Sequence, residues 1–328
     1  MKKYLICRTD SIGDLMLATP LIKAVKESAK KAYVAVLAGA AAAEILRGNP
    51  AVDEIIIYEK SKEASLRKKI AEGRFDGAIT AYPRFSIASL VFFSGVKERY
   101  GTAYRWYSPL FFNRPVKMRR SRSEKHEADY NLELGSAITG EARAERVYYY
   151  VAEEEKAAAA RYISKKGLRS GFIIIHPGSR GSAWNLSPAK YGELAERAAR
   201  EAGLDILITG GPAEKELVNA VKAAAGSKGI YAMDEDLSLR EFGAVISAAS
   251  CLISSSTGPM HMAAALGVKT LSFFPPRSLP AMSAKRWGPL GNKSAVIEPL
   301  ETGLSGAAAM DTISIAHVTD RLLLLLKG

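Results

Sequence analysis

Cysteine and histidine are scarce in this 328-residue sequence, which has two cysteines and four histidines. Cys7 and Cys251 lie in separate short apolar runs, and neither belongs to a CxxC pair. A disulfide framework is therefore excluded, and buried thiols in a reduced cytosolic compartment are expected. The histidines show no HExxH or similar spacing, which argues against a metal centre built by the protein.

Long hydrophobic runs are also missing. The longest, around 87–96 and 322–326, fall well below the ~18 residues that a membrane span needs. The first apolar run ends at Arg8, before it reaches the length of a signal-peptide core. We therefore expect any contact with a membrane to be peripheral.

Acidic residues are outnumbered, at 34 against 46 basic ones, which gives a net charge of +12. This excess favours polyanionic partners such as nucleic acid, phosphorylated sugars or an anionic leaflet. The composition is otherwise that of a folded globular protein, with 48% hydrophobic residues. Because a domain usually has about 100 to 200 residues, the length predicts two domains.

Apolar runs alternate with segments of helical period in both halves, which is typical of parallel βαβ units. We predict strands at 4–7, 33–37, 54–58, 77–80, 146–151, 172–175, 204–209, 229–232, 251–254 and 270–274. We predict helices at 19–30, 40–46, 64–72, 86–93, 126–138, 153–166, 188–202, 214–225, 239–250, 260–266 and 313–327. The pattern indicates an α/β protein of two doubly wound domains facing a cleft, residues 1–168 and 169–328. The last helix should be packed against the rest of the protein, and it is one candidate for packing back on the first domain.

Residues 104–123 break this alternation and are interpreted as a functional loop or an insertion. Basic residues gather at the end of the segment and just after it: Lys117, Arg119, Arg120, Arg122 and Lys125. Such a run is usually a solvated, mobile surface. The alternative is a binding surface for an anionic ligand.

The first turn, Arg8-Thr9-Asp10-Ser11-Ile12-Gly13-Asp14, leads from a strand into a helix at the edge where α/β sheets place their sites. It is neither a GxGxxG fingerprint nor a Walker loop. Asp14 would lie in the first helical turn, either as a base facing a ligand or as an ordinary acid stabilised by the helix dipole. Position alone favours the ordinary acid, and Asp10 or Ser11 is the expected cap.

Two loops in the second half are suited to anions. Residues 177–182, Pro-Gly-Ser-Arg-Gly-Ser, combine a flexible backbone with hydroxyls and one cation. Residues 254–267 bring serines, a threonine and a glycine to the start of an alanine-rich helix with free N–H groups. A loop without a ligand and an ordinary capped helix are the alternatives. His261, one turn inside that helix, is more typical of a structural histidine.

In this order, the motifs resemble those of glycosyltransferase family nine, the ADP-heptose:lipopolysaccharide heptosyltransferases. The resemblance covers nearly the whole chain. It is carried by Asp10 to Asp14 with Pro20, the His126 segment up to Leu134 and Gly135, His176 to Ser179 with Trp184, Gly210 to Glu214, and Ser256 to His261 with Ala263 to Leu266. Each motif is weak alone, but the ordered set is specific.

The family implies the GT-B architecture of two Rossmann-like lobes, with the acceptor on the first lobe and the nucleotide-sugar on the second. It implies inverting transfer of a heptose from ADP-heptose to the inner core saccharide of a lipopolysaccharide precursor. The expected partner is thus an anionic lipid-linked saccharide, reached by peripheral contact at the cytoplasmic face of the inner membrane. No cofactor, metal or nucleic acid is implied, since the ADP-sugar is a substrate.

The resemblance also assigns roles to residues. The family's base is the aspartate after the glycine of the first turn, here Asp14, which overrides the ordinary-acid interpretation. Glu214 matches the ribose-binding acid, Leu237 matches a position lining the adenine pocket, and His261 with Gly13 would contact the donor sugar. The expected diphosphate contacts are Ser179, Arg180, Ser182, Ser256, Thr257, Gly258, Pro259 and Met260. The expected acceptor contacts are Arg119, Arg120, Arg122 and Lys125.

Two positions depart from the family pattern. Ser182 and Ala183 stand where many members carry a lysine before the tryptophan, and Ser256 stands where many carry an aspartate. Fold and reaction class survive both departures. The alternatives are a nucleotide-sugar-binding protein with lost or altered turnover and a transferase of a different sugar. An epimerase of the same architecture is disfavoured because the motifs match throughout.

Overall fold

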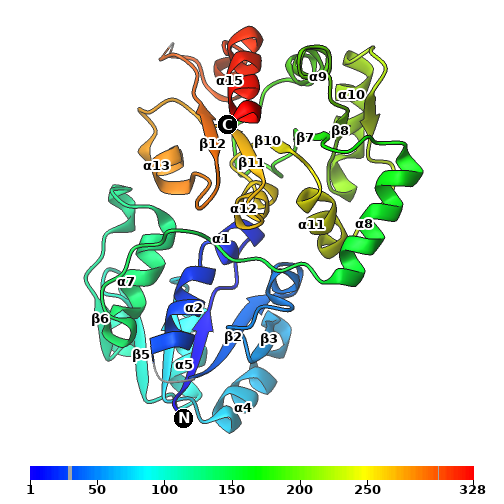
Figure 1. The fold of residues 1–328 in the computed structure, drawn as a ribbon. Helices are drawn as coiled ribbons and strands as arrows, with labels where there is room; N and C mark the ends of the chain where they lie inside the picture. Colours follow the sequence, from blue (N-terminus) through cyan, green and yellow to red (C-terminus); the bar gives the residue numbers. More distant parts are fainter. Residues whose placement is uncertain (29–31, 302) are drawn as a thin grey trace. The chain divides into compact units, whose positions relative to one another are not determined.

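The computed structural model describes residues 1–28, 32–301 and 303–328, and it divides into the compact units Met1–Tyr150 and Val151–Gly328 (Figure 1). The boundary predicted after residue 168 differs because helix α8 (Glu153–Lys166) packs against α11 (Leu239–Ser247) of the second unit. An ion pair joins the two helices, with Arg240 Nη2 at 2.6 Å from Glu155 Oε2. Helix α8 therefore belongs to the second unit.

The first unit has a six-stranded parallel sheet in the order β3-β2-β1-β4-β5-β6. The strands are β1 (Lys3–Cys7), β2 (Tyr33–Gly39), β3 (Glu54–Tyr58), β4 (Gly77–Thr80), β5 (Glu98–Thr102) and β6 (Arg114–Val116). The helices are α1 (Ile12–Met16), α2 (Thr19–Ser28), α3 (Ala40–Ala43), α4 (Glu63–Gly73), α5 (Phe85–Phe93), α6 (Ser108–Phe111) and α7 (Glu127–Thr139). This is the Rossmann strand order, which reverses between β1 and β4.

Both faces of this sheet are covered. Helices α2 and α7 pack together on one face, and α4 and α5 pack together on the other (Figure 1). Successive side chains of a strand point to opposite faces. Accordingly, Ala78 of β4 joins the core formed with α4 and α5, whereas Ile79 lies beside Gly135 of α7. The central strands β1, β2 and β4 are buried between two helical layers, so their sequences are largely continuous apolar runs.

The second unit repeats the design with the order β12-β11-β10-β7-β8-β9. Its strands are β7 (Ile173–His176), β8 (Ile206–Ile208), β9 (Ile230–Ala232), β10 (Cys251–Ser255), β11 (Lys269–Phe273) and β12 (Ser294–Ile297). Its other helices are α9 (Pro188–Ala202), α10 (Lys215–Ala224), α12 (Gly258–Ala265), α13 (Ala284–Trp287), α14 (Gly306–Met310) and α15 (Ile315–Lys327). Numbered from its own first strand, this sheet also has the Rossmann order, and it reverses between β7 and β10.

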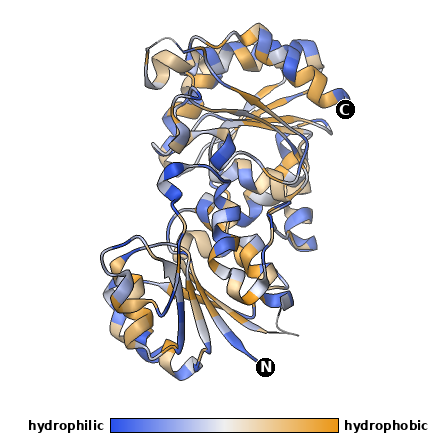
Figure 2. Ribbon diagram, turned by 90° about the vertical axis from the view of Figure 1, so that its left-hand side faces the viewer, coloured by the Kyte–Doolittle hydropathy of each residue, from blue (hydrophilic) through white to orange (hydrophobic). Residues whose placement is uncertain are grey.

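Helix α15 packs on the core of the second unit. It contacts α9 and β12, and Val318 and Leu322 are fully buried in the core that Leu194 of α9 and Ile208 of β8 also form. The strands beneath these helices consist largely of hydrophobic residues, coloured orange in Figure 2. The apolar residues found on more than one face of α15 are explained by this packing.

Most predicted elements are confirmed, and β3, β4, α8 and α9 have the predicted bounds. The strand predicted at 146–151 is wrong, because these described residues form a connector. Val147 is fully buried, and the Tyr148 N–H donates to Thr19 Oγ1 at 2.9 Å, so their pattern reflects packing outside the sheet. Strands β5, β6 and β12 were not predicted, and the end of the helix predicted at 19–30 lies outside the described residues.

The two cysteines are buried in strands β1 and β10. Burial raises the pKa of both thiols to about 12, so they are unreactive packing residues. Among the helices that the structure describes, none combines the length and the apolar character needed to cross a bilayer.

Candidate active site

Asp14 lies in α1, directly after β1, where the strand order of the first sheet reverses. Ser11 caps this helix: its Oγ accepts from the Asp14 N–H at 3.2 Å and donates to Asp14 Oδ2 at 2.6 Å. Arg8 Nη2 binds the other carboxylate oxygen, Oδ1. Both oxygens of Asp14 are therefore oriented, while its side chain keeps 22% of its surface exposed to an incoming ligand.

The Arg8 guanidinium is the centre of a buried polar network, with only 2% of the side chain exposed. Besides Asp14, its acceptors are Asp10 Oδ1 at 2.8 Å, the Ala81 carbonyl at 3.1 Å, Glu127 Oε1 at 3.2 Å and Asn131 Oδ1 at 3.2 Å. Burial lowers the pKa of Arg8, but the three carboxylates raise it by more, so the net shift is upward. Burial also raises the pKa of Asp10, to about 6, against the opposing effect of Arg8. Arg8 is thus a permanent cation that holds Asp14 in place.

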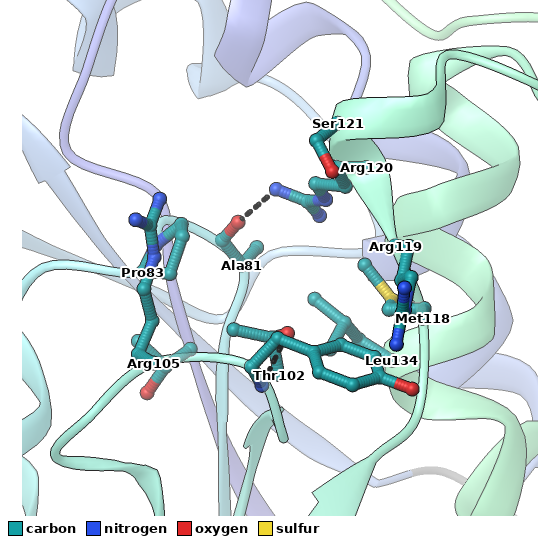
Figure 3. Close-up of a pocket in the computed structure, with 11 residues that line it drawn as sticks. Ala81, Pro83, Thr102, Arg105, Met118, Arg119, Arg120, Ser121 and Leu134 are labelled. Atoms are coloured by element: carbon teal, nitrogen blue, oxygen red, sulfur yellow. Dashed lines mark hydrogen bonds between the residues drawn. The ribbon is translucent and has the colours of Figure 1, made fainter.

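A pocket of about 330 Å³ opens at the same edge of the first sheet (Figure 3). It is lined by Thr80, Ala81, Pro83, Thr102, Tyr104, Arg105, Met118, Arg119, Arg120, Ser121 and Leu134. These residues follow the carboxyl ends of β4, β5 and β6, apart from Leu134 of α7 and the strand-end residues Thr80 and Thr102. Three arginines and an aromatic ring make the pocket suited to an anionic group with an apolar or sugar-like neighbour.

Arg120 belongs to this pocket and to the Arg8 network. Figure 3 shows its guanidinium bonded to the Ala81 carbonyl, at 2.7 Å from Nη1, and Nη2 donates to Asn131 Oδ1 at 2.9 Å. The same guanidinium lies 3.2 Å from Glu127 Oε1. Arg119 has fewer fixed partners and lies over the Tyr104 ring, 4.9 Å from its centroid.

The predicted acceptor residues thus separate into two groups. Arg119 and Arg120 line the pocket, whereas Arg122 and Lys125 lie outside its lining. Arg122 is 3.7 Å from Glu124, and Lys125 is 2.9 Å from Glu133, with both basic side chains more than half exposed. Of the two interpretations of the basic run, a solvated surface therefore fits Arg122 and Lys125.

In the second unit, the predicted donor residues follow four strands that end at one edge of the sheet. Ser179, Arg180 and Ser182 follow β7, Glu214 follows β8, Leu237 follows β9, and Ser256 to Met260 follow β10. Because the four strands are parallel, their carboxyl ends share this edge. Residues spread over about 80 positions of sequence are brought to one edge of one sheet.

The Glu214 carboxylate is held across the loop that follows β7. Its Oε2 accepts from the Gly211 N–H at 2.9 Å, and its Oε1 accepts from the Arg180 N–H at 3.3 Å. A Cβ at Gly178 would lie 2.2 Å from this carboxylate, so only glycine allows the approach. Arg180 has a left-handed backbone, with φ at 48°, and its side chain is exposed.

The hydroxyls of the loop after β7 are bonded within the second unit. Ser179 Oγ donates to the Ala183 carbonyl at 3.1 Å, and Ser182 Oγ donates to the Ser179 carbonyl at 2.7 Å. Ser255 Oγ, at the end of β10, donates to the Trp184 carbonyl at 2.7 Å. The loops after β7 and β10 are therefore joined where the strand order reverses.

Helix α12 starts at this junction. Thr257 is its N-cap, but its hydroxyl is 3.4 Å from Ser254 Oγ instead of accepting a helix N–H. The first-turn N–H groups of Gly258 and Met260 thus lack a cap from this side chain, as an anion site requires. His261 is 3% exposed within this helix, and Gly13 precedes Asp14 in α1 of the other unit.

His176, the last residue of β7, is neutral. Burial lowers its pKa to about 4, with Glu214 acting against this shift and Arg180 in favour of it. Its Nδ1 is 3.0 Å from Thr209 Oγ1, and its ring lies 5.9 Å from that of Phe242. It supports the base of the loop that carries Arg180.

Sequence reasoning missed the partners that hold Asp14. Glu127 and Asn131 are four positions apart on α7, so they lie on one helix face, and both are buried. Two polar residues at this spacing on one face of the helix were the sequence signal that could have indicated these partners. Arg105 of the pocket was also missed, although it lies in the segment interpreted as a functional loop. Among the described residues, no group of three or more His, Cys, Asp or Glu could hold a metal ion.

Two Rossmann-like domains in series, each with polar residues at its strand reversal, form the GT-B architecture. A model of glycosyltransferase family 9 (heptosyltransferase) matches residues 63–304. The chain belongs to this family and is a glycosyltransferase.

Relatives and solved structures agree with this assignment. The chain is 29% identical to a predicted glycosyltransferase of Haemophilus influenzae, over 89% of this chain and 87% of the relative. It is 21% identical to lipopolysaccharide heptosyltransferase 3 of Escherichia coli, over 80% of each. Its fold is similar to that of a family 9 protein from Veillonella parvula, with a TM-score of 0.86, 20% identity and coverage of 99% and 97%. It is also similar to E. coli ADP-heptose lps heptosyltransferase II, with a TM-score of 0.82, 23% identity and coverage of 100% and 99%.

Proposed function

We propose that this glycosyltransferase moves a heptose from ADP-heptose to an anionic, lipid-linked saccharide of the lipopolysaccharide core, with inversion at the anomeric carbon. The observation that carries the proposal is the placement of Asp14, oriented by Arg8 and Ser11 beside an arginine-lined pocket. An oriented, partly exposed carboxylate can accept the proton of an acceptor hydroxyl. The pocket supplies charge for an acceptor that carries phosphate or carboxylate groups.

In the reaction, an acceptor hydroxyl attacks the anomeric carbon and loses its proton to Asp14. The bond from that carbon to the diphosphate oxygen breaks, and ADP leaves with the electron pair. Attack from the face opposite the leaving group inverts the configuration, so no covalent intermediate is needed. The Arg180 guanidinium and the first-turn N–H groups of α12 would stabilise the negative charge that develops on ADP.

The donor site has support from geometry in the second unit. Glu214 is fixed by two backbone N–H groups beside Gly178, where a carboxylate can accept both hydroxyls of a ribose. Leu237, partly exposed in the loop after β9, offers an apolar contact for the base. The E. coli heptosyltransferases in the comparison bear on the donor, since one is named for ADP-heptose and another was solved with ADP.

The test is transfer itself. The purified chain, ADP-heptose and a heptose-free core acceptor should yield ADP and a product heavier by one heptose, measured by a coupled ADP assay and mass spectrometry. Donor screening with ADP-, UDP- and GDP-sugars by thermal shift should show preferential stabilisation by the ADP-sugar. Donor binding without ADP release would instead favour a nucleotide-sugar-binding protein. Stabilisation by a UDP- or GDP-sugar alone would overturn the assignment of the donor.

A further inference from the structure

The first unit exposes a group of large apolar side chains, which we call the aromatic face. It consists of Phe85, Phe92, Phe93, Trp106 and Leu110, whose exposed fractions are 47%, 37%, 54%, 76% and 63%. These residues come from α5, from the loop before α6, and from α6. Soluble proteins rarely expose large contiguous apolar patches, and such patches mark sites of interaction with a protein or a membrane.

The rings of the aromatic face form one connected cluster, and Leu110 adjoins Phe111 of that cluster in the chain. Phe111, which is nearly buried, touches Phe85 with ring centroids 5.3 Å apart, Phe92 at 5.5 Å and Phe93 at 6.4 Å. Trp106 stacks on Phe85 at 5.4 Å, with the ring planes 16° apart. Stacking onto a supported ring fixes the most exposed side chain, so Trp106 points outward from a rigid base.

Cations surround this face. Arg67 lies over the Phe93 ring at 5.2 Å, and Arg99 lies over the Phe92 ring at 5.0 Å. Arg84 precedes α5, and Arg105 precedes Trp106. From residue 77 to residue 123 the chain has nine Lys or Arg residues and one acidic residue, so this stretch carries a net charge of +8 out of the total of +12.

The single acid of this stretch, Glu98, is bonded to Arg114 at 3.0 Å and to Tyr100 at 2.9 Å. These contacts lower the pKa of Glu98, the bond from Tyr100 contributing most. Arg120 and Arg122 pair with Glu127 and Glu124, which follow the stretch, and the other seven basic residues outnumber its single acid. Outward-pointing aromatic rings among arginines are the pattern of a surface that enters the headgroup layer of an anionic bilayer.

We propose that the aromatic face docks the protein on an anionic lipid bilayer, with Trp106 and Leu110 inserted among the headgroups and the arginines bound to lipid phosphates. A second copy of this chain is disfavoured as the occupant, because a two-fold interface would place the same cationic stretch against itself. The inference goes beyond the proposed transfer reaction. Tyr104 and Arg105 of the pocket adjoin Trp106 in the chain, so the docked surface would bring the pocket near the headgroups.

Vesicle binding tests the proposal without any saccharide acceptor, so its failure is distinguishable from failure of the transferase assay. The protein should sediment with vesicles of phosphatidylcholine and phosphatidylglycerol, and binding should weaken at high salt or without phosphatidylglycerol. The double variant Trp106→Ser/Leu110→Ser should lose about tenfold in apparent affinity, given the apolar area that it removes. The matched control is Leu300→Ser/Leu324→Ser, which alters two leucines of the second unit that are 77% and 62% exposed and should bind as the unmodified protein does.

Depth of insertion provides an independent measurement. Lipids brominated in the upper acyl chain should quench part of the tryptophan fluorescence, and Trp106→Phe should abolish that part while retaining vesicle binding. Equal binding of the Trp106→Ser/Leu110→Ser variant and its control would overturn the proposal, as would equal binding to vesicles with and without phosphatidylglycerol. Sedimentation velocity tests whether a second copy of the chain binds the aromatic face instead. If the unmodified protein is a dimer and the Trp106→Ser/Leu110→Ser variant is a monomer, the face is a dimer interface and the bilayer proposal is overturned.

Discussion

Arg8 and Arg120 share three acceptors: the Ala81 carbonyl, the Glu127 carboxylate and the Asn131 side-chain oxygen. The distances are 3.1, 3.2 and 3.2 Å from Arg8 and 2.7, 3.2 and 2.9 Å from Arg120. Arg8 also binds Asp14, and Arg120 lines the pocket. The pocket and the carboxylate are therefore built on one buried network, in which Glu127 and Asn131 of α7 orient both guanidinium groups.

Loss of the Glu127 charge should destabilise the protein strongly. Glu127 is 1% exposed and faces both Arg8 and Arg120. Removing one partner of a buried ion pair leaves uncompensated buried charge, which typically costs about 3–5 kcal/mol. Glu127→Gln should lower the free energy of unfolding by roughly this amount, measured by urea denaturation of the first unit's transition.

The matched control is Glu133→Gln on the same helix. Glu133 pairs at 2.9 Å with Lys125, a side chain that is 53% exposed. An exposed pair contributes about 0–1 kcal/mol, so this variant should unfold almost as the unmodified protein does. Equal unfolding free energies for the two variants would contradict the role given to Glu127.

Much of the fold could be predicted from local signals. Helix α9 has the predicted bounds because Ser187 and Pro188 mark its start, and Gly203, with φ at 67°, ends it. Strands β5 and β12 escaped prediction because each carries exposed or polar side chains near an edge of its sheet. A pattern that assumes burial on both faces misses such strands.

The candidate site was predicted only in part, for a different physical reason. Asp14 and the segment Ser256–Met260 belong to contiguous motifs, so the sequence shows them directly. Glu127 bonds Arg8 across 119 positions of sequence, and the folded sheet with its covering helix is what brings the two residues together. Such contacts leave no local pattern, so the sequence does not reveal that Arg8 holds Asp14.

Asp14→Asn should reduce turnover and spare donor binding. The amide keeps the shape and the oxygen acceptor for Arg8, but it cannot take a proton from the acceptor hydroxyl. General-base catalysis contributes about 10²- to 10⁴-fold, so kcat should fall by that factor in an ADP-release assay. The dissociation constant for ADP, measured by calorimetry, should stay within about twofold of the unmodified value. Turnover near that of the unmodified enzyme would exclude Asp14 as the base.

Arginines inside and outside the pocket should differ in their effect on the acceptor. Arg119→Ala removes a pocket guanidinium and should raise the acceptor KM about tenfold at low salt, an effect that added salt reduces. Arg122→Ala removes a neighbouring arginine that is 58% exposed and outside the pocket lining, so it should leave the acceptor KM nearly unchanged. Initial rates over a range of acceptor and donor concentrations give both constants. A donor KM that rises together with the acceptor KM would count against an acceptor pocket.

The donor loop allows a comparison that separates ribose from phosphate recognition. Glu214→Gln should weaken both ADP and adenosine about tenfold, because a ribose hydroxyl loses a charged acceptor. Arg180→Gln should weaken ADP to a similar extent but leave adenosine unchanged, because it removes a cation from the diphosphate. Calorimetry with the two ligands measures all four affinities. Equal losses of both ligands in both variants would indicate general damage to the loop and contradict the two assignments.

The stability of the second unit should depend on pH through His176. Its pKa is lowered to about 4 in the folded state, so between that pH and the unfolded value of 6.5 the unfolded chain binds the additional proton. The His176 contribution to folding is therefore fully present above pH 6.5 and is lost as the pH falls toward 4, by on the order of 3 kcal/mol. Asp10, whose raised pKa of about 6 favours the folded state at low pH, acts with the opposite sign in the first unit. Urea unfolding of the second unit's transition at several pH values should show this loss, and His176→Asn should remove most of it. An equal pH dependence in the variant would show that His176 is not the group responsible.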